Sequence, residues 1–521
     1  MFNTLDWLII GFYCVGIITL ATYVSRKKSG TTRSAEDYFL AGRSLPWWAI
    51  GASLIAANIS AEQIIGMSGQ GWVVGMAIAV WELTAAIALI VMAKYFLPIF
   101  LEKKIYTMPQ FLEQRFDKRV SLVLSFFWLI VYIFINLTSV LWLGSLAINA
   151  LTGIDIFHAL MILAFFSLAY SLLGGLKAVA MTDVVQVVLL IFGGLAVSYI
   201  ALDKISDSAG IFEGIKILVT EMPEKFDMIL SKDNDSYSDL PGIWILLGLG
   251  VWIGHFFYWG FNQYITQRAL GAKSIQEAQK GVMFAAYLKL LMPIVIVLPG
   301  ICAAVLFPYL DKPDQAYPNM MSLLPNGLLG LTFAALIAAI ISSLASMSNS
   351  ISTIFTMDIY KQFKKNEVSD SFLIDIGRAT VIISILIATI MAKPLLGSFE
   401  SIFQYIQNFT GYFSPGIVVI FLVALFWKKA TSLSVLIAAL ISLFASIIIS
   451  VLFPELPFIH RMTIVFILSA FGCWLTAFAQ GYKIHKKAIN LNGINFSTSR
   501  AFNINTSIIL SVLILIYVML G

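Results

Sequence analysis

The sequence predicts an all-α integral membrane protein with about fourteen transmembrane helices. The chain has 521 residues, of which 60% are apolar and only 12% are charged. A soluble domain carries about 25% charged residues, so most of this chain is expected to lie in lipid. Apolar runs of roughly 20 residues, the length that crosses a bilayer, recur along the whole sequence. The charged residues gather in the short segments between those runs.

The apolar runs form a single predicted transmembrane domain over residues 1–521. They lie near residues 4–25, 46–68, 72–99, 120–150, 157–175, 181–203, 242–266, 281–308, 325–357, 371–392, 399–427, 430–453, 460–482 and 502–520. The first run contains Asp6 and lacks both a preceding basic residue and a small-residue cleavage site, so we expect a retained helix. Cys14, Cys302 and Cys473 all lie in apolar runs, which predicts neither disulfides nor a metal site.

Basic residues fall in every second loop and predict the orientation of the chain. The first loop carries Arg26, Lys27, Lys28, Arg33 and Arg43, and the later alternate loops are also rich in lysine and arginine. Cytoplasmic loops carry this excess, so we expect both termini to face outside. The net charge of +5 follows from the same bias and does not require a nucleic-acid partner.

Polar residues within the predicted spans indicate a carrier for small solutes. The longest segments outside the spans, 204–241 and 483–501, contain neither a Gly-rich phosphate-binding loop nor a nucleophile motif, so we expect neither a pump driven by ATP nor an enzyme. Ionisable groups at membrane depth cost a few kcal/mol each and usually mark a pathway or a buried pair. In this chain they include Glu62, Glu82, Asp183, His255 and Lys289.

Two of the spans are interrupted by polar and small residues. The second contains Asn58 and Gln63 and ends in glycines, and the seventh is rich in glycine around His255. Such segments unwind at mid-membrane, where their carbonyl groups bind a cation or a hydroxylated solute. Paired interrupted helices predict an inverted-repeat core, here residues 46–427, with the halves 46–203 and 242–427.

A serine pair on the ninth span is a candidate cation site. Ser342 and Ser343 follow Ala339 by three and four residues, which places the three on one helical face. Hydroxyl and carbonyl oxygens suit an alkali cation, but small hydroxylated residues also serve helix packing in membranes, so both interpretations remain open. For Glu82 and Lys289 the sequence favours a functional role or a buried pair over simple packing, and for Asp183 and His255 a functional and a structural interpretation are both open.

Several motifs resemble the sodium/solute symporter family nearly end to end. They begin at Glu36 (EDYFLAGR), Pro46 (PWWAIGAS), Gly174 (GGLKAV), Thr182 (TDVVQ) and Phe355 (FTMDIY). Further motifs at Ala57 (ANISAEQ), Tyr258 (YWGFNQY) and Phe403 (FQYIQ) are similar to the sodium–galactose branch of that family. The resemblance implies symport of sodium with a neutral sugar, galactose or glucose, by alternating access in a bacterial inner membrane. It also implies one extra N-terminal and three extra C-terminal helices around a five-plus-five core.

The resemblance further implies a sodium site between the second and ninth spans, with a sugar site beside it. The implied sodium ligands are the carbonyls of Ala56, Ile59 and Ala339 and the hydroxyls of Ser342 and Ser343, with Asp183 along the sodium exit route. The implied sugar contacts are Asn58, Gln63, Glu82, Lys289 and Gln407, with Tyr258 stacked beneath the sugar as an inner gate. Met67, Trp81 and Phe403 match an outer hydrophobic gate. No cofactor is expected beyond the coupling sodium.

The chain departs from the branch at four positions. Ala85, His255 and Trp81 stand where the branch has serine, asparagine and tyrosine, which bears on the choice of hexose. A missing hydroxyl leaves a sugar OH unpaired at a cost of about 1–3 kcal/mol, which Thr84 or His255 would offset as a sugar contact. Ala345 replaces a hydroxyl of relatives with a second sodium site, so one sodium per sugar is expected.

Two alternatives remain open from the sequence. The first is a sodium symporter for myo-inositol, another sugar, a nucleoside or a sugar acid, with Lys289 as the counter-ion of an acid. The second is a sensor with a transporter fold, which the lack of a signalling domain after Gly521 disfavours. The sequence does not predict an oligomeric state.

Overall fold

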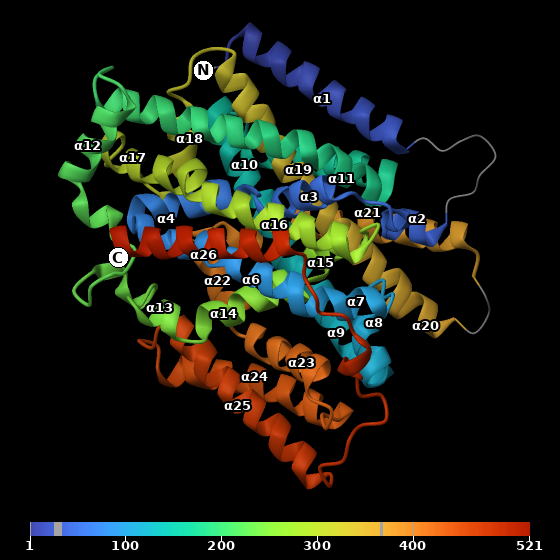
Figure 1. Ribbon diagram of the computed structural model, residues 1–521. Coiled ribbons are helices and arrows are strands. Elements are labelled where there is room, and N and C mark those ends of the chain that lie inside the picture. The colour runs from blue at the N-terminus through green and yellow to red at the C-terminus, as the bar shows by residue number, and fades with distance from the viewer. Residues whose placement is uncertain (1, 26–33, 365–367, 400) are drawn as a thin grey trace.

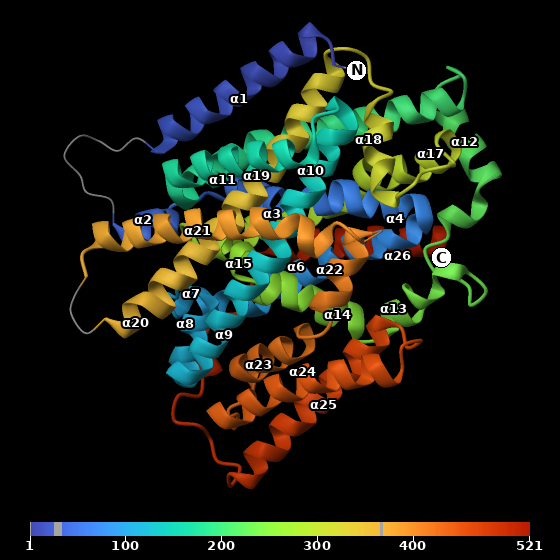
Figure 2. The ribbon, with the colours of Figure 1, turned by 180° about the vertical axis from the view of Figure 1, so that it is seen from behind.

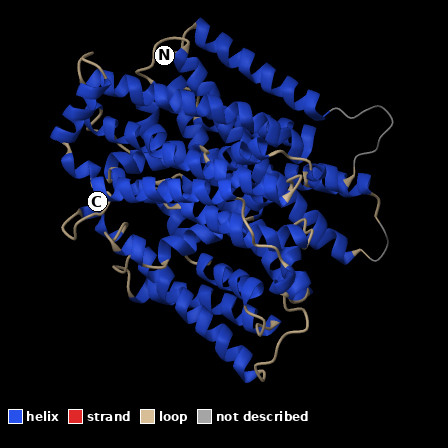
Figure 3. Cartoon of the chain, in the orientation of Figure 1, coloured by secondary structure: helices blue, strands red, loops and turns tan. Residues whose placement is uncertain are grey.

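The computed structural model describes residues 2–25, 34–364, 368–399 and 401–521. Within these ranges the chain is helical and contains no strand, as Figure 3 shows, which confirms the predicted fold class. Arg26, Lys27, Lys28 and Arg33 of the predicted basic first loop lie outside the described residues.

The long helices follow the predicted order, and several spans consist of two helices in succession. They are α1 (Thr4–Ser25), α3 (Trp47–Asn58) with α4 (Ser68–Val73), α5 (Val80–Leu83) and α6 (Ala85–Val91) with α7 (Leu97–Glu102), α9 (Lys118–Val131) with α10 (Thr138–Thr152), α11 (Ile156–Ile205), α14 (Gly250–His255) with α15 (Gln263–Leu270), α16 (Ile275–Met292) with α17 (Leu298–Leu306), α19 (Leu328–Ile354), α21 (Asp370–Leu396), α22 (Ile402–Thr410) with α23 (Ser414–Phe426), α24 (Ser432–Leu452), α25 (Phe458–Ala479) and α26 (Arg500–Leu520). Shorter helices lie between them: α2 (Ala35–Phe39), α8 (Met108–Arg115), α12 (Ile211–Glu221), α13 (Trp244–Leu247), α18 (Ala316–Met321) and α20 (Lys361–Phe363).

When spans are counted by the length and composition of the helices, the number is smaller than the fourteen predicted. In the described part of the chain, ten segments are long and apolar enough to cross a membrane, and two bent pairs raise the number to twelve. The bent pairs are α3 with the helix Glu62–Val73, at 60°, and α22 with α23, at 47°. The predicted span 157–175 corresponds to the shorter apolar helix Ile156–Leu172, and 242–266 is divided among short helices. The number fourteen therefore stays a prediction.

The helices that carry the candidate site pack at the centre of the bundle. Helix α19 packs against α11 and α3, and α16 packs against α3. In both ribbon views α1 lies at one edge of the bundle, and α24 and α25 lie at the opposite edge (Figures 1 and 2). The two interrupted spans, α3 with Glu62–Val73 and α14 with α15, are called the two broken helices below. They are thus enclosed by protein, where freed backbone groups find partners at membrane depth.

The predicted spans 157–175 and 181–203 lie on either side of a break in α11 at Gly175, where the backbone leaves the helical conformation. This glycine has φ +62°, and a Cβ atom there would lie 2.5 Å from the carbonyl oxygen of Tyr38. Both the positive φ and the close approach require glycine. Beyond the break, α11 brings Asp183 against α3 and α19, where its carboxylate accepts hydrogen bonds from Ser53 and Ser342.

Short π-helical turns interrupt several of the long helices. Three of them border the candidate site: Glu62–Met67, Tyr132–Leu137 and Phe256–Phe261. A π-turn inserts an extra residue into a helix and frequently occurs at functional sites. Each turn changes which side chains face the centre of the bundle, so an ideal helical period does not predict the lining of the site.

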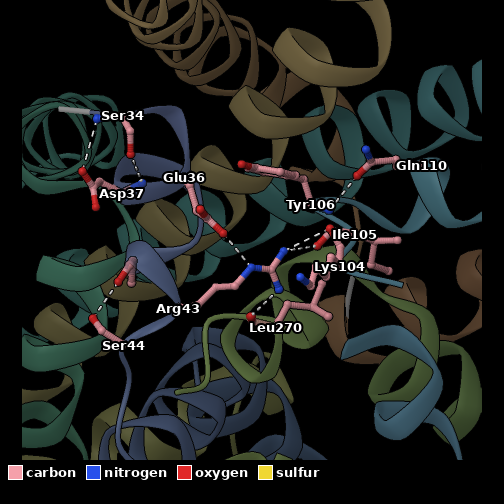
Figure 4. Close-up of polar contacts among 11 residues, drawn as sticks. Ser34, Glu36, Asp37, Arg43, Ser44, Lys104, Ile105, Tyr106, Gln110 and Leu270 are labelled. Carbon is pink, nitrogen blue, oxygen red and sulfur yellow. Dashed lines mark hydrogen bonds and ion pairs between the residues drawn. The ribbon is translucent and has the colours of Figure 1, made fainter. Parts of the chain in front are cut away.

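Arg43 joins three segments at one end of the bundle (Figure 4). Its guanidinium donates to Glu36 Oε1 at 2.7 Å, to the carbonyl oxygens of Lys104 and Ile105 at 3.1 Å each, and to that of Leu270 at 3.4 Å. These partners precede α3, connect α7 to α8 and end α15. The rigid fork of arginine serves several acceptors at once, so this residue fixes the relative positions of both broken helices.

Candidate functional site

One cavity at the centre of the bundle is lined by every residue predicted to contact the sugar or to form a gate. These residues are Asn58, Gln63, Met67, Trp81, Glu82, His255, Tyr258, Lys289, Phe403 and Gln407. They come from both broken helices and from α5, α16 and α22. Distant parts of the chain thus bring the predicted contacts and gates together in one cavity. The individual roles of these residues stay predictions.

The first broken helix ends through local hydrogen bonds of its own polar side chains. Helix α3 stops at Asn58, after which Ile59 is extended with ψ 92°. Gln63 Oε1 accepts hydrogen bonds from the backbone N–H of Ser60 at 3.3 Å and from the Ser60 hydroxyl at 3.2 Å. Such bonds compete with the helical pattern. They also engage the carbonyl oxygen of the Gln63 amide, which leaves the NH₂ group of this cavity-lining residue without a partner among the described residues.

Lys289 and Glu82 form a buried ion pair in the wall of the cavity. Lys289 Nζ lies 2.6 Å from Glu82 Oε2, with side-chain exposures of 1% and 3%. The ammonium also donates to the side-chain oxygen of Asn58 and lies 5.0 Å from the ring centre of Trp259. Buried charges are stable only when paired and hydrogen-bonded in this way. The lysine charge is therefore already balanced by the protein.

Tyr258 connects the two broken helices at their breaks. Its hydroxyl accepts hydrogen bonds from Asn58 Nδ2 at 3.1 Å and from the Tyr264 hydroxyl at 2.8 Å. The chain becomes extended at Asn262, between the π-turn Phe256–Phe261 and α15. Tyr258, the predicted inner gate, therefore joins the two broken helices through its hydroxyl.

His255 is paired with Thr84 at the edge of the cavity. The Thr84 hydroxyl donates to the Val80 carbonyl at 2.5 Å and lies 2.7 Å from His255 Nε2. Its single proton is committed to Val80, so Nε2 must carry the proton that Thr84 accepts. Nδ1 is then left as an acceptor. Thr84 and the buried Ala85 do not themselves line the cavity, so His255 is the better candidate to replace the missing hydroxyl.

The predicted outer gate lies where the two bent helices meet. Met67 and Phe403 are buried, and a Cβ atom on Gly66 would lie 2.8 Å from Phe403 Cβ, so glycine permits this close approach. Trp81 makes an edge contact with His255 and stacks against Phe458. Aromatic and apolar side chains thus cover this end of the cavity.

Asp314 lies beside the predicted outer gate, in the connection between α17 and α18. Its Oδ2 accepts a hydrogen bond from the first backbone N–H of α22, that of Ile402, at 3.4 Å. Burial raises the pKa of Asp314 to about 6, a shift that this backbone hydrogen bond and Lys312 oppose. The carboxyl therefore contacts the first turn of α22 directly.

The predicted sodium ligands lie at the contact between α3 and α19. The Ser343 hydroxyl donates to the Ala56 carbonyl at 3.3 Å, directly before the break in the first helix. Ile59 follows in the break, and Ala339 is buried one turn before the serines on α19. The hydroxyl and carbonyl oxygens that the family resemblance implies as sodium ligands therefore come from the contact between these two helices.

Asp183, the predicted exit residue, is in direct contact with one predicted sodium ligand. It accepts from the Ser342 hydroxyl and from Ser53 Oγ at 2.5 Å. Arg268 Nε donates to Ser53 Oγ at 3.1 Å, and the same guanidinium donates to Ser346. A chain of polar groups thus leads from the serine pair to α15.

The cavity also has lining residues that are not among the predicted sugar contacts and gates. They include Glu62, Trp128, Asn136, Trp259, Asn262, Thr410, Phe458 and Met462. Glu62 was recognisable as an acid within a span, and Asn262 belongs to a quoted motif. Phe458 and Met462 belong to α25, outside the predicted core, and their apolar surroundings carry no local signal. Sequence reasoning therefore missed mainly the aromatic and C-terminal walls.

Two broken helices around a central polar cavity define a secondary transporter with discontinuous helices. Residues 38–449 match the model of the sodium:solute symporter family, and the chain belongs to that family. It is 46% identical to the sodium/glucose cotransporter of Vibrio parahaemolyticus, over 98% of this chain and 97% of that protein. It is 32% identical to the sodium/myo-inositol cotransporter 2 of Mus musculus, over 81% of this chain and 66% of that protein.

The fold is also similar to that of a solved transporter. A substrate-bound, outward-open Na⁺-coupled sialic acid symporter superposes with a TM-score of 0.80 at 22% identity, over 92% of this chain and 98% of that one. The family and the fold together make this chain a multi-pass membrane transporter that couples solute movement to sodium, and not an enzyme.

Proposed function

We propose that the protein takes up a neutral sugar, galactose or glucose, together with one sodium ion. The observation that carries this proposal is the buried pair between Lys289 and Glu82. A sugar acid would need a free cation in the cavity, but the Lys289 ammonium is already bound by Glu82 and Asn58. Neutral hydroxyls need the mixture of amide, carboxylate and aromatic groups that lines this cavity.

The proposed sugar contacts follow from the atoms left free by the internal hydrogen bonds. Gln63 offers its NH₂ group as a donor, because its oxygen is held by Ser60. His255 offers Nδ1 as an acceptor, and Glu82 retains Oε1 beside the atom that binds Lys289. Gln407 adds an amide from α22, and Tyr258 adds a ring face from below.

Sodium is proposed to act by ordering the break in the first helix. Its ligands would be the carbonyls of Ala56, Ile59 and Ala339 and the hydroxyls of Ser342 and Ser343. The Ser343–Ala56 hydrogen bond already joins the two helices involved. An ion that binds only when α3 and α19 are together favours the conformation that holds Asn58 and Gln63 in place for the sugar.

Alternating access would then move the halves 46–203 and 242–427 against each other. Met67, Trp81 and Phe403 would close the outer side, and Tyr258 would move to open the inner side. Asp183 would receive the ion on its way out, because it already binds Ser342. Ala345 lies in an apolar cluster with Ile17 and Tyr170, which supports a stoichiometry of one sodium.

One sodium provides enough driving force for useful accumulation. A single charge that moves through about 100 mV contributes about 2.3 kcal/mol. A tenfold sodium gradient adds about 1.4 kcal/mol. The sum of about 3.7 kcal/mol supports accumulation of a neutral solute by roughly 500-fold.

The location proposed for the protein is a bacterial inner membrane, with both termini outside. The loops rich in lysine and arginine would then face the cytoplasm, including the segment of Arg43, Lys104 and Lys273. The Arg43 contacts in Figure 4 would accordingly lie on the cytoplasmic side, near the inner gate.

The experiment that tests the proposal is uptake of labelled galactose, glucose and myo-inositol into proteoliposomes. Inward gradients of sodium, potassium and protons are compared at the same membrane potential. We expect accumulation of a hexose with sodium only. Preference for myo-inositol would support the alternative raised by the relative in Mus musculus, and accumulation of a sugar acid alone would contradict the proposal.

A further inference from the structure

The cavity contains a second carboxylate, Glu62, which the proposed sugar contacts do not use. Glu62 lies in the π-turn after the break in the first helix, lines the cavity and is 9% exposed. Its backbone N–H donates to Ser60 Oγ at 3.2 Å. Its carboxylate makes no hydrogen bond or ion pair with any residue that the structure describes.

The charged groups around the cavity leave Glu62 without a positive partner. The charge of Lys289 is matched by that of Glu82, because Lys289 Nζ lies 2.6 Å from Glu82 Oε2. His255 takes its proton at Nε2 toward Thr84 and needs no charge for this bond. Whenever it is ionised, Glu62 therefore adds a negative charge to the cavity that no described residue balances. An unpaired buried carboxylate is costly and attracts a cation or a hydrogen-bond donor.

The surroundings of Glu62 suit a cationic group on a sugar. Trp81, Trp128 and Trp259 line the same cavity, and these apolar surroundings strengthen the attraction between the Glu62 carboxylate and a bound cation. Lys289, which lines the same cavity, is bound to Glu82, and no lysine or arginine among the described residues forms an ion pair with Glu62.

We propose that Glu62 sets the charge selectivity of the cavity, so that it binds amino sugars with a protonated amine as well as neutral sugars, and rejects sugar acids. The inference rests on the proposed function, because it concerns the same cavity. It adds a ligand class, the ammonium-bearing hexose, and one residue that recognises it.

The test is competition against labelled neutral hexose in sodium-driven uptake. The competitors are a 2-amino-2-deoxyhexose, its N-acetyl derivative and the matching uronic acid, at neutral pH, where most of the amine is protonated. In the unaltered protein we expect the amino sugar to inhibit at least about tenfold better than the uronic acid, as for one charge pair in a partly solvated cavity. The N-acetyl derivative separates the effect of charge from that of size.

Variants assign this preference to the single carboxylate. Glu62→Gln keeps the shape but removes the charge, and we expect the ratio of the two inhibition constants to fall by about tenfold. Glu62→Asp keeps the charge and should retain the ratio even if uptake is slower. Glu213→Gln removes an acid exposed on α12, far from the cavity, and should change nothing.

The outcomes distinguish this inference from the proposed function. If neutral hexose is taken up with sodium but the ratio is the same in Glu62→Gln, only the role of Glu62 is overturned. If the uronic acid competes better than the amino sugar in the unaltered protein, the inference also fails, whether or not the variants fold. If no neutral hexose is taken up, the proposed function fails first.

Discussion

Lys289 Nζ lies 2.6 Å from Glu82 Oε2, and neither side chain reaches solvent outside the cavity. Because the two charges depend on each other, we predict that removing one is worse than removing both. Glu82→Gln or Lys289→Met alone should destabilise the protein by about 3–5 kcal/mol, and the double variant by less than either. Thermal unfolding of the four proteins in detergent measures this coupling. Additive effects of the two changes would contradict the pairing.

The Thr84–His255 contact predicts an indirect effect on sugar affinity. Thr84→Val preserves the shape but removes the acceptor of the His255 Nε2 proton, so Nδ1 is no longer held as an acceptor toward the sugar. We expect the apparent sugar affinity to fall by about 1 kcal/mol, or roughly fivefold. The matched control, Thr84→Ser, keeps the hydroxyl and should be close to the unaltered protein. Equal behaviour of the two variants would exclude this role.

Arg43 predicts a structural effect at the end of the bundle shown in Figure 4. Arg43→Lys keeps the charge, but a single ammonium does not reach the acceptors at Glu36, Lys104 and Leu270 together. We expect faster backbone hydrogen exchange around Lys104 and Ile105 and a loss of about 1–3 kcal/mol in local stability. Arg119→Lys, in an exposed pair with Asp117, provides the control. Unchanged exchange in Arg43→Lys would contradict the assigned contacts.

Asp314 predicts a pH dependence of stability. Burial raises the pKa of its carboxyl from 3.8 to about 6, so the folded protein binds this proton more tightly than the unfolded chain does. Stability should therefore decrease as pH rises from about 4 to about 6, by roughly 2–3 kcal/mol from this group. Asp314→Asn should remove that part of the slope in thermal unfolding, whereas exposed Asp311→Asn should not. An identical slope in Asp314→Asn would contradict the shift.

The fold class could be predicted from the sequence because it depends on composition. The residues that form the predicted sugar contacts and gates could be predicted because they belong to recognisable motifs. Asn58 and Gln63 interrupt an apolar run, and Lys289 and Glu82 stand out in lipid-length segments. The pairing of Lys289 with Glu82 stayed open, because two charged residues 207 positions apart give no sign of mutual distance. Only the packing of α16 against the first half brings them together.

Other features depend on geometry that local patterns do not determine. The predicted separation of two spans coincides with the break in α11 at Gly175, but a glycine in an apolar segment predicts neither its φ nor its neighbour Tyr38. The π-turns shift the helical period by one residue, which conceals the cavity-facing position of Asn136. Phe458 reaches the cavity through the placement of α25, and its sequence context resembles that of any lipid-facing phenylalanine.

The role of Ser343 is the central claim, because it determines whether sodium drives transport. Sodium-driven sugar uptake is measured in proteoliposomes that contain the unaltered protein, Ser343→Ala, or the control Ser384→Ala, whose hydroxyl donates only to the Thr380 carbonyl of its own helix. We predict sodium-dependent accumulation in the unaltered protein and in the control, and its loss in Ser343→Ala, even at high sodium. Sodium-driven accumulation with normal sodium affinity in Ser343→Ala would contradict the account.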